Sequence, residues 1–144
     1  MRNILVATFV ALALLFCNAA PGMAESQRHV FANITTNDTN RAAMAIQFTR
    51  AIMKNKGMQA TLFFNTYGVE LVHAGKPSPR YADGQTIADM LRQFMDEGGT
   101  VLACPMCMKH VGSMTTADLL PGVSAREGGG VEAVTRPDTL VLSY

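Results

Sequence analysis

Three short apolar runs, each about as long as one β-strand, alternate with two longer segments in which apolar residues recur at helical spacing. The runs lie at residues 28–34, 59–65 and 100–104, and the helical segments lie between them, at residues 41–56 and about 86–97. The second run is almost wholly apolar, as expected for a strand covered on both faces of a sheet. This alternation predicts a single α/β domain with a mostly parallel sheet flanked by helices.

The ends of these elements, and the segments outside them, have local signals of their own. Asp38 or Thr39 is positioned to cap the first helical segment, and Gly57 is expected to end it. Thr115 or Thr116 is positioned to cap a short helix further along the chain. The other predicted elements are an extended piece at residues 68–73, a loop at 75–84, short helices at 115–120 and around 131–135, and a last strand at 139–144.

Residues 1–24 have the shape of a secretory signal peptide. A basic start is followed by an apolar run from residue 4 to residue 16 and by small residues that end at Ala24. The run is shorter than the roughly 20 apolar residues that a membrane span needs. We therefore predict cleavage after Ala24 and one exported, periplasmic domain at residues 25–144, with no stable membrane span. The alternatives are an uncleaved anchor and a lipid attached at Cys17.

The charge balance argues against nucleic acid as a partner. The 12 Lys and Arg side chains include Arg2, so eleven remain after cleavage, against 11 Asp and Glu side chains. Nucleic-acid binding depends mainly on Lys and Arg contacts to phosphate, and here no block of positive charge is present. The roughly 120 residues after the cleavage site suit one domain with a core of its own.

The stretch CPMCMKH, residues 104–110, holds most of the chemistry in the chain. Cys104 ends the run at residues 100–104 and is therefore predicted at the carboxyl end of a strand, where ligands of parallel sheets bind. After cleavage, Cys104 and Cys107 are the two cysteines that remain. A Cys-x-x-Cys pair serves redox sites, metal sites and sulfur relays, but it closes too small a loop to be an effective structural disulfide. Lys109 and His110 follow closely and are expected to favour the thiolate. The alternative is that Lys109 is a solvated surface lysine.

The methionines in this region support a second interpretation. Thiolate and thioether ligands select Cu(I), so Cys104, Cys107, Met106 and His110 are candidate copper ligands. Methionine also fills gaps in apolar cores, and several methionines elsewhere in the chain have that explanation. A closed structural zinc site is disfavoured because no second pair of ligands is present. A third interpretation is an interaction module whose cysteines form a passive redox switch.

Two long stretches resemble the DsrE/DsrF-like family, and together they cover most of residues 28–123. They are TTNDTNRAAMAIQFTRAIMKNKGMQATLFFNTYGVELV and CPMCMKHVGSMTTADLLPGV. The resemblance implies a flavodoxin-like α/β fold, assembly as a homotrimer or a dimer of trimers, and sulfur relay through a cysteine persulfide. It places the working cysteine eight residues before a glycine, which is the spacing from Cys104 to Gly112, and makes Cys107 an added partner.

These observations predict an exported sulfur-relay or thiol protein that carries sulfane sulfur on Cys104 or cycles the Cys104–Cys107 pair, with Lys109 and His110 in supporting roles. Such a protein resembles a sulfurtransferase partner without high turnover. It requires no cofactor, and its partner is a thiol or a sulfur-carrier protein. The alternative function is a periplasmic Cu(I)-binding protein.

Overall fold

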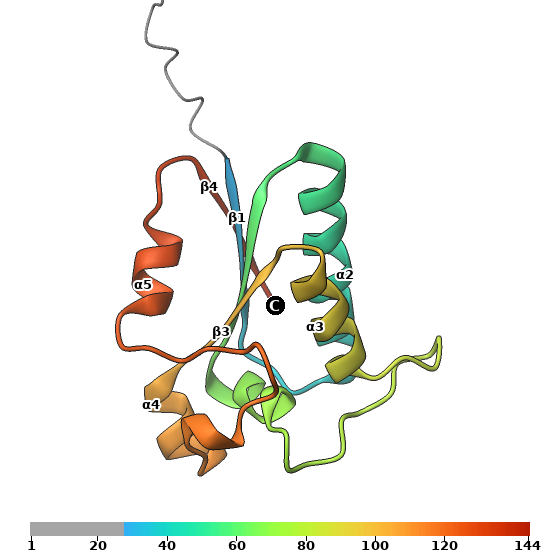
Figure 1. The fold of residues 1–144 in the computed structure, drawn as a ribbon, viewed down its shortest axis with the longest axis vertical. Helices are drawn as coiled ribbons and strands as arrows, with labels where there is room; N and C mark the ends of the chain where they lie inside the picture. The colour runs from blue at the N-terminus through green and yellow to red at the C-terminus, as the bar shows by residue number, and fades with distance from the viewer. Residues whose placement is uncertain (1–27) are drawn as a thin grey trace, which may run out of the picture.

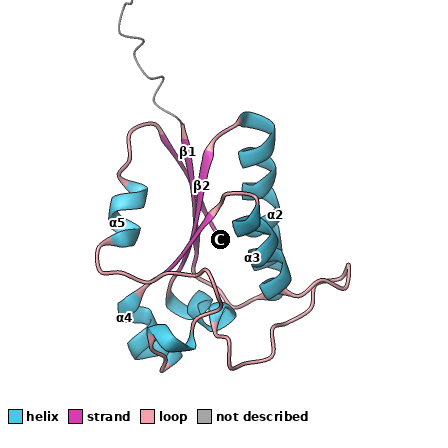
Figure 2. Cartoon of the chain, viewed as in Figure 1, coloured by secondary structure: helices cyan, strands magenta, loops and turns pink. Residues whose placement is uncertain are grey.

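In the computed structural model, which describes residues 28–144, four parallel strands form one sheet between two groups of helices (Figure 1). The order of the strands across the sheet is β3-β2-β1-β4, and every neighbouring pair is parallel. Helices α2 and α3 cover one face, and α5 lies on the other (Figure 2). The predicted α/β class is therefore confirmed. The strands are β1 (His29–Ile34), β2 (Gln59–Phe64), β3 (Thr100–Ala103) and β4 (Thr139–Ser143).

The helical elements differ widely in length. The α-helices are α2 (Thr39–Lys56), α3 (Ile87–Asp96), α4 (Pro105–Cys107) and α5 (Gly129–Val134), and the 3-10 and π turns are η1 (Thr66–Val72), η2 (Met108–Gly112) and η3 (Thr116–Asp118). Asp38 caps α2, because its carboxylate accepts the Arg41 backbone N–H at 2.8 Å. Gly57 ends that helix in the left-handed conformation, with φ of 63°. Both predicted ends of α2 are confirmed.

The two faces of the sheet carry separate apolar clusters. The main cluster packs the strands against α2 and α3 and includes the fully buried Ile34, Leu62 and Phe64. Each large apolar side chain buried in this way contributes about 1.5–3 kcal/mol to folding. The smaller cluster, on the face that carries α5, is built on Phe31 and Leu102. Because α5 has only six residues, it covers that face less completely than α2 and α3 cover theirs.

The prediction of an extended piece at residues 68–73 is wrong, because residues 66–72 form the 3-10 turn η1. The chain turns here across the end of β1, and Gly68 packs directly against it. A Cβ atom at Gly68 would lie 2.4 Å from the Ile34 carbonyl oxygen. The buried residues of this segment are Gly68, Val69, Leu71 and Val72, which do not alternate as a strand covered on one face requires.

The remaining predicted elements are present with small shifts. The short helix expected at residues 115–120 is the turn η3, and Thr115 is its cap in a reciprocal arrangement with Asp118. The helix expected around residues 131–135 is α5. The predicted signal peptide lies outside the described residues. Within residues 28–144, no helix combines the length and the apolar character needed to cross a membrane.

Candidate functional site around Cys104 and Cys107

Cys104 lies at the carboxyl edge of the parallel sheet, directly after the last residue of β3. Its backbone N–H donates to the Phe64 carbonyl at 2.9 Å, which fixes it to the end of β2. Its own carbonyl accepts the Met108 N–H at 2.9 Å and starts the helical segment that follows. Ligands of open α/β sheets bind beyond the carboxyl ends of the strands. The predicted place of Cys104, at a strand end on this edge, is confirmed.

The segment from Pro105 to Gly112 is helical throughout, with α4 running directly into the π turn η2. Pro105 occupies the first turn of α4, where a backbone N–H would have no acceptor within the helix, so proline is tolerated there. The segment ends at Ser113, which is left-handed with φ of 49°. A Cβ atom at Gly112 would lie 2.9 Å from the Met114 sulfur, so glycine lets the chain fold back over the buried Met114. The cysteine pair thus opens a helical segment that is tied down at both ends.

The two thiols are free, half-buried and in contact with each other. Burial raises the pKa of the Cys107 thiol, and the hydrogen bond and charge interaction with Cys104 raise that pKa further. The Thr66 backbone N–H donates to Cys107 and opposes these effects. Thr66 holds this position with φ of 49°, an unusual conformation for a β-branched residue. Cys107 is therefore kept as a protonated thiol beside the sulfur of Cys104.

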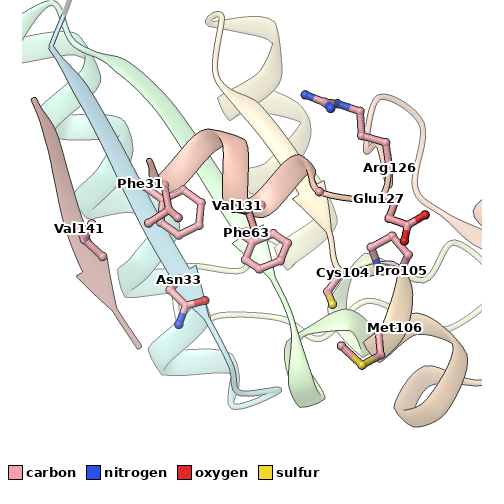
Figure 3. Close-up of a pocket in the computed structure, with 13 residues that line it drawn as sticks. Phe31, Asn33, Phe63, Cys104, Pro105, Met106, Arg126, Glu127, Val131 and Val141 are labelled. Carbon is pink, nitrogen blue, oxygen red and sulfur yellow. The ribbon is translucent and has the colours of Figure 1, made fainter. Parts of the chain in front are cut away.

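A cavity of about 600 Å³ opens beside Cys104 on the face of the sheet that carries α5 (Figure 3). Its walls come from β1, β2, β4, α4, α5 and the loop before α5. The residues that matter most for its chemistry are Phe31, Asn33, Phe63, Cys104, Met106, Val131 and Val141. Most of this wall is aromatic or aliphatic. The sequence offered one signal for it, since strand residues alternate between faces and Phe31 and Phe63 must point away from α2.

Gly130 and two charged residues shape the cavity on the side of α5. A Cβ atom at Gly130 would lie 2.6 Å from the Phe63 ring, so glycine lets α5 approach the sheet closely. Arg126 lines the cavity and forms an exposed ion pair with Glu132. Glu127 lines the cavity too, and no ion pair involves it within residues 28–144. Sequence reasoning did not identify these residues, because their position depends on how α5 docks.

The comparisons with known proteins agree with this fold. The model of the DsrE/DsrF-like family matches residues 29–136. The chain belongs to this family. It is similar in fold to the ychN protein from E. coli, whose crystal structure superposes with a TM-score of 0.64 at 19% sequence identity, covering 82% of this chain and 99% of that one. At this identity the likeness shows the fold alone. No curated protein matches the sequence.

Within this DsrE/DsrF-like domain, the three methionines near the cysteines have different surroundings. Met108 and Met114 are 2% and 5% exposed and belong to the main core, whereas Met106 is 68% exposed and lies in the cavity wall. Of these three methionines, Met106 is thus the one free to contact a ligand. No cluster of three or more His, Cys, Asp and Glu side chains that could hold a metal occurs within residues 28–144.

Lys109 and His110 have exposed side chains on the π turn η2. Neither contributes to the shift in the pKa of Cys107, which comes from burial, Thr66 and Cys104. Their expected role in favouring a thiolate therefore stays a prediction. Along the chain, the same turn that presents Lys109 and His110 to solvent directs Met108 into the core.

Proposed function

We propose that this DsrE/DsrF-like protein is an exported sulfur-relay protein of the periplasm, in which Cys104 carries sulfane sulfur as a persulfide. The observation that carries the proposal is the position of Cys104, which lies at the carboxyl edge of a parallel sheet, in the wall of a cavity and in contact with a second free thiol. Family membership supports a sulfur-relay type of function for this domain. The working unit is a homotrimer or a dimer of trimers, and the partner is a thiol or a sulfur-carrier protein.

The relay consists of two thiol exchanges. The Cys104 thiolate attacks the outer sulfur of a donor persulfide, so that a new S–S bond forms on Cys104 and the donor leaves as its thiolate. An acceptor thiolate then attacks the outer sulfur of the Cys104 persulfide, takes that sulfur and leaves Cys104 as a thiolate again. Neither exchange changes the total number of electrons, so the cycle needs no oxidant or reductant.

Cys107 decides how long the persulfide lasts. If the Cys107 thiolate attacked the inner sulfur, a Cys104–Cys107 disulfide would form and hydrosulfide would leave, and a dithiol reductant would then have to restore the pair. Because burial raises the pKa of the Cys107 thiol, little thiolate is present at neutral pH. We therefore expect the raised pKa to slow the intramolecular attack and to leave the outer sulfur available for transfer. This favours a carrier over a passive redox switch.

A second proposal, from a different class, is a Cu(I)-binding protein with the predicted ligands Cys104, Cys107, Met106 and His110. Because Cys104, Cys107 and His110 do not form a metal-binding cluster within residues 28–144, His110 would have to move toward the cysteines to complete this set. The observation that favours it is the contact between the two free thiols, with the exposed Met106 thioether in the same cavity wall as Cys104. Soft sulfur ligands of this kind select Cu(I). In this arrangement both cysteines would be needed for full affinity.

The experiment is mass spectrometry on the mature protein, purified from the periplasm without reductant or chelator, under native and denaturing conditions. We expect extra sulfur that survives denaturation, is removed by a reductant, and is lost in the Cys104→Ser variant but kept in Cys107→Ser. The native spectrum also gives the number of subunits. Copper that is present natively and lost on denaturing would support the second proposal. A disulfide without sulfur or copper would overturn both proposals.

A further inference from the structure

The wall of the cavity beside Cys104 is far more apolar than sulfur transfer alone requires. The rings of Phe31 and Phe63 lie 5.8 Å apart, tilted by 35°, and both line the cavity. Val131 on α5 and Val141 on β4 also line it, although they are 66% and 51% exposed. Exposed valines beside two aromatic rings provide a surface that an apolar group would cover favourably.

The size of the cavity separates classes of sulfur donor. Cavities that hold small organic molecules usually measure about 300–1,000 Å³, and this one measures about 600 Å³. Hydrosulfide or a short inorganic polysulfide would fill only a small part of that volume and would have no apolar surface to place against Phe31, Phe63 and Val131. A donor that fills the cavity must bring an organic group together with its sulfur.

The charges at the cavity disfavour anionic donors. Among the described residues, Arg126 is the one Lys or Arg side chain that lines it, and its guanidinium is paired with Glu132. The carboxylate of Glu127 has no such partner within the same part of the chain, and Figure 3 shows it on the side of Pro105. An anionic donor would therefore meet a negative charge without a free positive one to balance it.

On the basis of the proposed function, we propose that the donor to Cys104 is a small organic hydropersulfide that reacts in its protonated form R–S–SH and whose uncharged aromatic or branched alkyl group R occupies this cavity. In the transfer, the Cys104 thiolate forms an S–S bond to the outer sulfur of R–S–SH. The bond between the two donor sulfurs breaks, R–S⁻ leaves, and the proton stays on the transferred sulfur. The product is the Cys104 persulfide, and no further reactant is needed.

The test compares two donors, benzyl hydropersulfide generated in situ and inorganic polysulfide. The rate of persulfide formation on Cys104 is followed by mass spectrometry, and each rate is divided by the rate of the same donor with a free small thiol. We expect the corrected rate to favour the benzyl donor on the order of tenfold or more, which is the usual discrimination for an apolar group in a matching pocket. The Val141→Asp and Val131→Asp variants should lose this preference.

Leu140→Asp is the matched control, because it makes the same kind of substitution on the same strand. Leu140 is 44% exposed, neighbours Val141 and does not line the cavity. The Leu140→Asp variant should therefore keep the preference for the benzyl donor. Val131→Asp, on an exposed face of α5, provides the second variant if Val141→Asp does not fold. A readout without sulfur transfer is the binding of phenylmethanethiol to the Cys104→Ser variant, measured by shifts in the NMR signals of Phe31 and Phe63.

The outcomes separate this inference from the function on which it rests. Persulfide formation from both donors with no corrected preference, together with no binding of phenylmethanethiol, would overturn the donor class and leave the relay standing. No persulfide on Cys104 from either donor would overturn the relay, and the donor class with it. A preference that Val141→Asp and Val131→Asp abolish and Leu140→Asp keeps would support the donor class.

Discussion

The substitution Gly68→Ala tests how the turn η1 is held against the sheet. Gly68 does not have a positive φ, so alanine could adopt its backbone conformation, and helical propensity alone would favour alanine by about 0.5–1 kcal/mol. The new Cβ atom, however, would lie 2.4 Å from the Ile34 carbonyl oxygen and 3.2 Å from its carbon. Ile34 is fully buried at the end of the central strand β1 and cannot move aside.

The turn must therefore shift, and the cost should resemble that of overpacking a core, about 1–3 kcal/mol. For a domain of this size we expect the melting temperature to fall by about 4 °C for each kcal/mol. The first assay is denaturant unfolding of the purified protein. Gly57→Ala is the control. Gly57 has φ of 63°, and a Cβ atom there would have no neighbour within 4 Å. The loss of unfolding free energy in this variant therefore measures backbone strain alone, about 1 kcal/mol.

A second assay connects the same substitution to the site. Thr66, at the start of η1, donates its backbone N–H to Cys107 and lowers the pKa of that thiol. If η1 moves, this hydrogen bond is weakened and the pKa of Cys107 rises further, so alkylation of Cys107 at neutral pH should slow. The measurement uses the Cys104→Ser background to isolate one thiol. Unchanged stability together with an unchanged alkylation profile would refute the reasoning.

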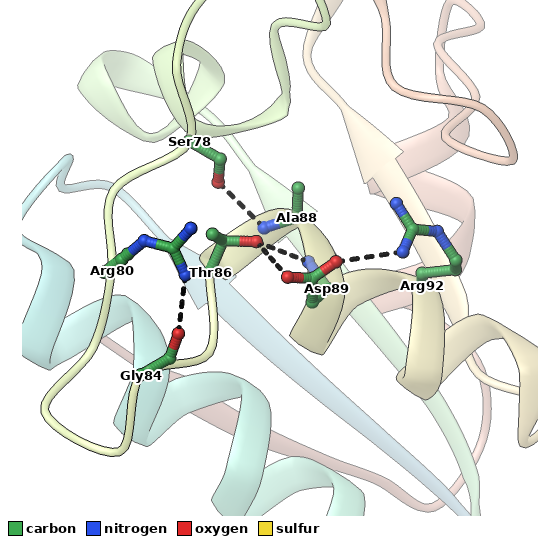
Figure 4. Close-up of polar contacts among 7 residues, drawn as sticks. All are labelled: Ser78, Arg80, Gly84, Thr86, Ala88, Asp89 and Arg92. Atoms are coloured by element: carbon green, nitrogen blue, oxygen red, sulfur yellow. Dashed lines mark hydrogen bonds and ion pairs between the residues drawn. The ribbon is translucent and has the colours of Figure 1, made fainter.

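Two further predictions concern pH and helix capping. Burial, and then the charge of Arg136, lower the pKa of His29 below 6.5, so the unfolded chain takes up the proton first and stability should fall as the pH drops below 6.5. The drop in urea midpoint between pH 7.5 and 5.5 should be smaller in His29→Gln, and an equal drop in both proteins would contradict this. The hydroxyl of Thr86 caps α3 by accepting the Asp89 N–H at 3.1 Å (Figure 4). Thr86→Ala removes this cap and should lower the free energy of unfolding, measured by thermal unfolding, by about 1 kcal/mol. The control Gln85→Ala should cause no loss.

The order of the elements could be predicted because the signals for it are local. The strands are continuous apolar runs, the helices have the 3.6-residue period, and Asp38 and Gly57 mark the ends of α2. The position of Cys104 followed from the same reasoning, since a residue that ends a parallel strand must lie at the carboxyl edge of the sheet.

The turn η1 and the cavity could not be predicted, because they depend on contacts between distant parts of the chain. Gly68 packs against the carbonyl of Ile34, 34 residues earlier in the sequence, and no local pattern records that contact. The cavity exists because α5 is short and because Gly130 lets it approach Phe63, 67 residues earlier in the chain. Its wall is therefore a property of how α5 docks on the sheet.

The strand order β3-β2-β1-β4 has a consequence for how the chain folds. β1 lies inside the sheet, yet one of its two neighbours is β4, the last element of the sequence, and His29 bonds to Thr139 across 110 residues. While the chain is being synthesised, β1 has an unpaired edge until residues 139–143 have been made. Closing so long a loop is slow, because the entropy is lost before the contacts form. The second edge of β1 is therefore paired only after the 110-residue separation between His29 and Thr139 has been synthesised.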